Sequence, residues 1–75
     1  MMTLFERAIK LAAAKALEEQ LDTLVTVDDL EITKSIIWRV NYTYYVTCPE
    51  FDDFEVQVRT DAGNAPISVT VYEYQ

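Results

Sequence analysis

The residues of this chain that could perform chemistry are a single cysteine and several pairs of neighbouring carboxylates. Cys48 is the only thiol, and the 75 residues include no histidine. A cysteine nucleophile attacks as its thiolate and usually depends on a neighbouring base, most often histidine, to form it. Cys48 also alternates with Val46 on the apolar side of its segment, so we expect a buried and unreactive thiol. The sequence therefore does not predict nucleophilic catalysis.

Neighbouring carboxylates that could work as a pair lie in two segments, 28–31 and 50–55. A catalytic acid/base pair needs a concave site that gives its two carboxyl groups different pKa values, and a domain of this length has little material for one. Neither segment has the alternating aspartates, glycine and distal glutamate of a calcium loop. Tetrahedral zinc sites use several cysteines or histidines, which are missing. We expect no enzyme activity, cofactor or metal, and interpret both segments as solvated loops.

A long helix is predicted for residues 3–24. Thr3 and Glu6 have the spacing of a capping box, and no glycine or proline follows before residue 24. Five alanines add helix propensity. At 100° per residue one side of this helix is apolar, and it consists of Phe5, Ile9, Ala12, Ala13, Ala16, Leu17 and Leu24.

Beyond Val25 the apolar residues alternate with a period of two, which predicts strands at 30–34, 35–48, 54–60 and 67–74. Pro49 with Asp52 and Asp53 interrupts the pattern, and residues 61–64 hold the only glycine in a turn signal. The long strand 35–48 would divide its side chains between two faces. One face carries Ile36, Trp38, Val40, Tyr42, Tyr44, Val46 and Cys48, and the other carries Ile37, Arg39, Asn41, Thr43, Tyr45 and Thr47.

These elements predict an α+β fold in one domain, residues 1–75. One N-terminal helix packs on a three- to four-stranded antiparallel β-meander and gives two layers. The order of elements, with the Asp61-x-Gly63 hairpin, resembles small cystatin-like and PepSY-type α+β domains. The resemblance covers the architecture and one turn, and it implies no particular function.

The charge is strongly acidic, with 13 Asp and Glu against 6 Lys and Arg and a net charge of −7. Phosphates would be repelled by such a surface, which argues against direct nucleic-acid binding. No apolar run is long enough to span a membrane, and the N-terminal residues lack the basic and apolar regions of a signal peptide. Together with the single cysteine, these features lead us to expect a cytoplasmic protein.

The acidic residues are concentrated in three places: the end of the helix, the segment that follows it, and the loop after residue 48. Acids at a helix C-terminus are unfavourable because the helix dipole prefers cations there. One explanation is solubility of a small domain, since this net charge is ordinary for one. The other is an electronegative surface that binds a basic partner.

Tyrosines form the second surface feature. A two-layer fold leaves one sheet face without a helix, and Tyr45, Tyr72 and Tyr74 should share that face, together with Ile37. Tyrosine is favoured in protein interfaces because it offers a large, rigid area with a polar tip. Cross-strand packing explains the same residues equally well.

The leading hypothesis is a small non-enzymatic inhibitor, of the phage or mobile-element type represented by anti-CRISPR and anti-restriction proteins. It would occupy a basic surface of a nucleic-acid-handling partner, with carboxylates mimicking phosphates. The alternative is a structural module that self-associates, as a homodimer, through the open sheet face or an edge strand. A small acidic enzyme or ligand carrier is a third hypothesis. The predicted partner-binding residues are Glu18, Glu19, Asp22, Asp28, Asp29, Glu31, Tyr45, Glu50, Asp52, Asp53, Tyr72 and Tyr74.

Overall fold

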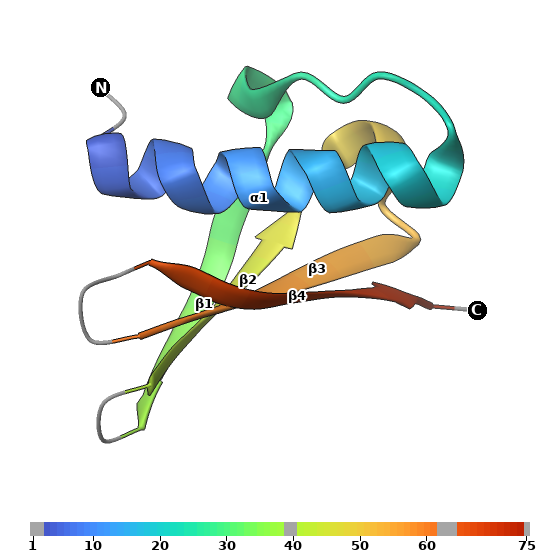
Figure 1. Ribbon diagram of the computed structural model, residues 1–75. Coiled ribbons are helices and arrows are strands. Elements are labelled where there is room, and N and C mark those ends of the chain that lie inside the picture. The colour runs from blue at the N-terminus through green and yellow to red at the C-terminus, as the bar shows by residue number, and fades with distance from the viewer. Residues whose placement is uncertain (1–2, 39–40, 62–64, 75) are drawn as a thin grey trace.

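One helix lies across one face of a four-stranded antiparallel sheet (Figure 1). The computed structural model describes residues 3–38, 41–61 and 65–74, except for the side chains of Lys34 and Trp38. The strands follow one another in the order β1-β2-β3-β4, which confirms the α+β meander expected from the sequence. The elements are α1 (Leu4–Leu21), η1 (Val27–Asp29), β1 (Glu31–Trp38), β2 (Asn41–Thr47), η2 (Pro49–Phe51), β3 (Phe54–Thr60) and β4 (Pro66–Glu73).

The helix begins at the predicted cap. The Glu6 backbone N–H donates to Thr3 Oγ1 at 3.0 Å, and the Thr3 hydroxyl donates to Glu6 Oε1 at 3.4 Å. The helix ends at Leu21, earlier than the predicted residue 24, because Asp22 adopts a left-handed conformation with φ of 53°. The Asp22 N–H still donates to the Glu18 carbonyl at 2.8 Å. Leu24 is consequently exposed and does not belong to the apolar stripe.

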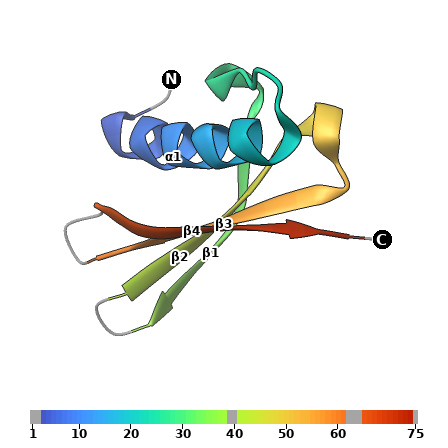
Figure 2. The same cartoon turned by 45° about the vertical axis from the view of Figure 1, so that its right-hand side comes forward.

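The core lies between α1 and the helix-facing side of the sheet (Figure 2). Small alanines bring the helix close to the strands, and the Phe5 ring meets Tyr44 edge-on, with centroids 5.2 Å apart. Burial also raises the pKa of Tyr44, with a smaller effect from Tyr42. The fully buried large side chains are Ile9, Leu17, Leu30, Val46, Val56, Val58 and Thr60.

The prediction of one strand over 35–48 is wrong. These residues belong to two antiparallel strands, β1 and β2, with Trp38 opposite Asn41, and the predicted strand 30–34 is the first part of β1. In the sequence, apolar residues continue to alternate across the connection between the two strands, and residues 38–41 contain no glycine or proline that would indicate a turn. Residues 39, 40 and 62–64 lie outside the described part, so the faces predicted for Arg39 and Val40 and the turn at Gly63 are not described.

The hairpin also exchanges two neighbouring side chains between faces. Residues directly opposite one another in a ladder point to the same side of the sheet. Ile37 pairs with Tyr42 and so lies on the helix-facing side, whereas Ile36 pairs with Thr43 and lies on the other side. The faces predicted for Ile36 and Ile37 are therefore the reverse of those observed.

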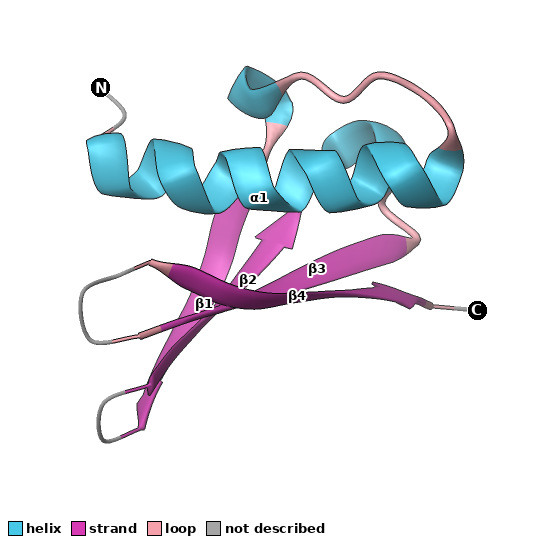
Figure 3. Cartoon of the chain, viewed as in Figure 1, coloured by secondary structure: helices cyan, strands magenta, loops and turns pink. Residues whose placement is uncertain are grey.

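The connection between α1 and β1 runs back alongside the helix before the chain enters the sheet (Figure 3). It contains η1 and packs Val25 and Leu30 into the core. Of the described helices, none is both long enough and apolar enough to cross a membrane.

Candidate protein-interaction surface

The sheet face opposite α1 carries three tyrosines. Tyr45 lies in one row with Gln57 and Thr70, and Tyr72 lies in the next row opposite Glu55. The neighbours Val56, Val58, Val69 and Val71 alternate with these residues and face the helix. Tyr72 and Tyr74 are exposed and Tyr45 is half-buried. The structure thus brings Tyr45, Tyr72 and Tyr74 onto one surface, which we call the open face.

Tyr74 is fixed in place by two hydrogen bonds. Its hydroxyl donates to Glu55 Oε1 at 2.9 Å, and its backbone N–H donates to the Asp53 carbonyl at 2.6 Å. The hydrogen bond to Glu55 raises the pKa of Tyr74, and partial desolvation and the charges of Glu55, Tyr45 and Tyr72 raise it further. Tyr74 is therefore a neutral hydrogen-bond donor at physiological pH, oriented by a carboxylate.

The open face is acidic at one end and basic at the other. Glu31 of β1 pairs with Thr47 of β2. Glu55 of β3 follows the Val46–Val56 pair in the next ladder, so it lies beside Thr47 on the side away from Glu31. Two strand spacings separate the two glutamates, so their Cα atoms are about 10 Å apart. Arg59 lies on the same face, in the row of Thr43 near the other end. The acidic end is the one that carries Tyr72 and Tyr74.

The acids at the end of the helix are on the other side of the molecule, and two of them have structural roles. Glu18 is half-buried, and its Oε2 accepts the Val25 backbone N–H at 3.0 Å. Asp22 provides the left-handed residue that ends α1. Glu19 is exposed on the last turn of the helix. A sequence pattern cannot reveal the Glu18 contact, because the path of the loop determines it.

The remaining predicted acids are divided between two short helices. Asp28 and Asp29 are exposed in η1, which lies alongside α1 on the helix side of the sheet (Figures 1 and 2). Glu50, Asp52 and Asp53 are exposed in and after η2, between β2 and β3. The predicted binding residues therefore do not form one surface. Glu31 and the three tyrosines gather on the open face, and sequence reasoning omitted Glu55 from the set.

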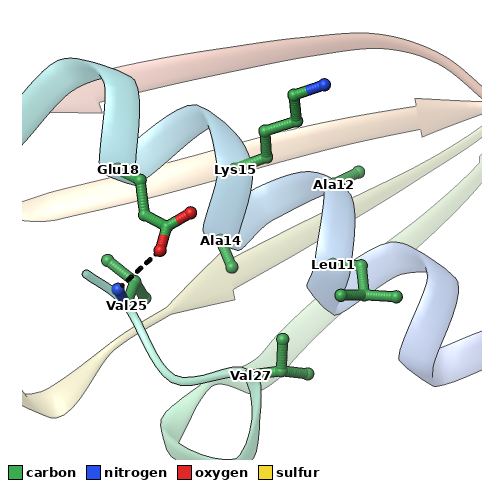
Figure 4. Close-up of a pocket in the computed structure, with 7 residues that line it drawn as sticks. All are labelled: Leu11, Ala12, Ala14, Lys15, Glu18, Val25 and Val27. Atoms are coloured by element: carbon green, nitrogen blue, oxygen red, sulfur yellow. Dashed lines mark hydrogen bonds between the residues drawn. The ribbon is translucent and has the colours of Figure 1, made fainter. Parts of the chain in front are cut away.

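A shallow groove lies on the helix side, between α1 and the loop before β1 (Figure 4). It encloses about 600 Å³, and the Val27 side chain points toward Leu11 across it. The hydrogen bond from Val25 to Glu18 fixes its far wall. Its surface is mostly apolar, and its lining consists of Leu11, Ala12, Ala14, Lys15, Glu18, Val25 and Val27.

The single thiol and the possible metal ligands were the groups of chemical interest in the sequence. The Cys48 side chain is 2% exposed and lies in the core. No three His, Cys, Asp or Glu side chains among the described residues lie close enough to share a metal ion. Comparisons with protein families, with curated proteins and with solved structures find no match.

Proposed function

We propose that this chain is a non-enzymatic protein-binding module that uses the acidic end of its open face to bind a basic surface on another protein. The observation that carries the proposal is the convergence of two carboxylates and three tyrosines on a sheet face that none of the described elements covers. Tyrosines supply contact area at a small cost in rotamer entropy, and the carboxylates select a cationic partner.

The net charge of −7 favours a partner of opposite charge. Basic surfaces of sufficient strength are typical of proteins that handle nucleic acid. Carboxylates on the open face would take the place of phosphates there and block access of DNA or RNA. The action would be that of an inhibitor, as in anti-CRISPR or anti-restriction proteins of phages and mobile elements.

The orientation of Tyr74 supports the same surface. An interface residue that is already held in one rotamer loses less entropy on binding. The hydrogen bond to Glu55 restricts the Tyr74 side chain in this way. Glu55 itself pairs with Tyr72, so both tyrosines lie beside the same carboxylate. The Glu55 carboxylate has further lone pairs with which to accept from an arginine or lysine.

The test compares two charge reversals of equal size. The immobilised chain is exposed to host lysate, and bound proteins are identified and then assayed for DNA or RNA binding in the presence of the chain. We expect Glu31→Lys/Glu55→Lys to abolish capture and Asp28→Lys/Asp29→Lys to preserve most of it. Each substitution by lysine changes the charge by +2, so each double variant has a net charge of −3 in place of −7. The difference between them therefore reports position and not total charge.

Salt provides the second criterion. Capture should fall between about 0.1 M and 0.5 M NaCl, because the Debye length shortens from about 10 Å to less than half of that. Capture that is indifferent to salt and to both reversals would refute the proposal. Greater loss with Asp28→Lys/Asp29→Lys would place the binding surface on the helix side instead. Thermal unfolding of each variant establishes that it is folded.

A further inference from the structure

The two edge strands of the sheet differ in how their charged residues are distributed. At one edge, β1 has the charged residues Glu31 and Lys34 in its sequence and a register shift between Ile32 and Lys34. Charges and bulges are the usual means of preventing an edge strand from pairing with another chain. At the other edge, β4 has an uncharged run from Pro66 to Tyr72 that is rich in β-branched residues, and every residue of that run except Val71 is exposed. The register of β4 also shifts, at Ile67 between Pro66 and Ser68, so the stretch of this edge that is both regular and uncharged runs from Ser68 to Tyr72.

Among the described residues, no strand pairs with the outer side of β4. The Tyr74 N–H points toward β3, where it donates to the Asp53 carbonyl. Because the direction of these groups alternates along an antiparallel strand, the N–H and C=O groups of Val69, Val71 and Glu73 point away from β3. These residues are available to pair with a further strand.

A groove accompanies the same edge. It encloses about 290 Å³ and is lined by Ala12, Lys15, Ala16 and Glu19 of α1 and by Val69 of β4. A strand added beside β4 would direct alternate side chains toward α1, into this groove. The alanines leave room for side chains of moderate size, such as valine.

We infer that β4 pairs with β4 of a second copy of this chain, antiparallel and about a two-fold axis at Thr70. In this register Val69 lies opposite Val71 of the copy, and the two central pairs form about four backbone hydrogen bonds. The sequence of β4 is compatible with this pairing. The valines lie on the side of the groove, Ser68, Thr70 and Tyr72 lie on the open face, and no two residues of like charge are placed opposite each other. Two four-stranded sheets become one sheet of eight strands.

This dimer leaves the open face uncovered, so it is compatible with the proposed function and independent of it. The two open faces become continuous, with Tyr72 of each copy opposite Ser68 of the other. The response to salt also separates the two ideas. Each copy carries a charge of −7, so added salt should strengthen the dimer, whereas it should weaken binding to a basic partner.

The test measures oligomeric state by sedimentation velocity from about 1 µM to about 300 µM, the range suited to a small interface. We expect a dimer that Val69→Lys weakens at least about tenfold. The matched control is Ile36→Lys, because Ile36 lies on the opposite edge strand and has a similar exposed fraction, 40% against 36% for Val69. A monomer throughout the range, or a dimer unaffected by Val69→Lys, would overturn the inference.

Cross-linking with oxidised glutathione tests the register. A cysteine at position 70 would face its counterpart at a Cα separation of about 4.5 Å, which suits a disulfide. Cysteines at position 68 would lie about 14 Å apart, too far for one. Thr70→Cys should therefore form a covalent dimer and Ser68→Cys should not. Equal cross-linking of the two variants would contradict the two-fold axis at Thr70.

Discussion

Replacing Glu18 by alanine distinguishes structural from functional acids at the end of α1. The Glu18 carboxylate accepts the Val25 backbone N–H at 3.0 Å, and Val25 is buried. This contact holds the loop that carries Val25 and η1 against the helix. Glu19, the next residue, is exposed. Both glutamates stand at the unfavourable end of the helix dipole, so Glu19→Ala is a matched control.

The difference between the two variants isolates the hydrogen bond. Both substitutions gain a few tenths of a kcal/mol from alanine's helix propensity, and both remove a carboxylate that the dipole disfavours, which gains about 0.3–1 kcal/mol. Only Glu18→Ala also leaves a partly buried N–H without its partner, which costs about 1–3 kcal/mol. We expect Glu18→Ala to be less stable than Glu19→Ala by about 1.5 kcal/mol.

Thermal unfolding followed by circular dichroism measures this difference. For a domain of this size about 1 kcal/mol corresponds to 4–8 °C in Tm, so the two variants should differ by about 6–12 °C. Glu18→Gln keeps an acceptor oxygen and should recover most of the loss. Equal melting temperatures for Glu18→Ala and Glu19→Ala would show that the contact contributes nothing and would restore Glu18 as a candidate binding residue.

Three further measurements test other parts of the structure. Thr60 is 0% exposed and its hydroxyl has no hydrogen-bond partner among the described residues. Thr60→Val should therefore raise the free energy of unfolding by about 1 kcal/mol in denaturant titration, and a lower free energy would show that the hydroxyl has a partner. The hydrogen bond to Glu55 raises the pKa of Tyr74 above 10.0, so this bond should stabilise the fold below pH 10 and cease to do so as pH rises through the pKa of Tyr74 in the folded state. Glu55→Gln should lower that pKa in an ultraviolet tyrosinate titration, and an unchanged titration would contradict the contact. Cys48, which is buried, should react with a thiol reagent only when the chain unfolds, and prompt labelling of the native protein would refute its placement in the core.

Local rules in the sequence predict the helix and most of the sheet. The cap at Thr3 and the alternation in β3 and β4 depend on neighbouring residues alone, and the structure agrees with both. The division between β1 and β2 could not be predicted, because the hairpin connection interrupts neither the alternation nor the composition. The end of α1 was missed for a related reason, since Asp22 in a left-handed conformation leaves no mark in the hydrophobic pattern.

The candidate surface was only partly predictable for a different physical reason. The tyrosines could be assigned to one face from parity within their strands, and parity is a local property. The acids could not, because a cluster in the sequence is not a cluster in space. Glu18 turns to the loop, whereas Glu55 lies between Thr47 and Tyr72 only because three strands share one register.

The division of the acids changes what the net charge of −7 implies for binding. If total charge were the important quantity, any two reversals would weaken binding to a basic partner by similar amounts, because long-range attraction depends little on position. If the open face is the surface that binds, reversal at Glu31 and Glu55 acts within contact distance, where screening by salt is weakest. A dimer through β4 would sharpen this contrast, since it doubles the open face and leaves Asp28 and Asp29 far from it. A binding loss that depends on position therefore carries more information about this protein than its charge does.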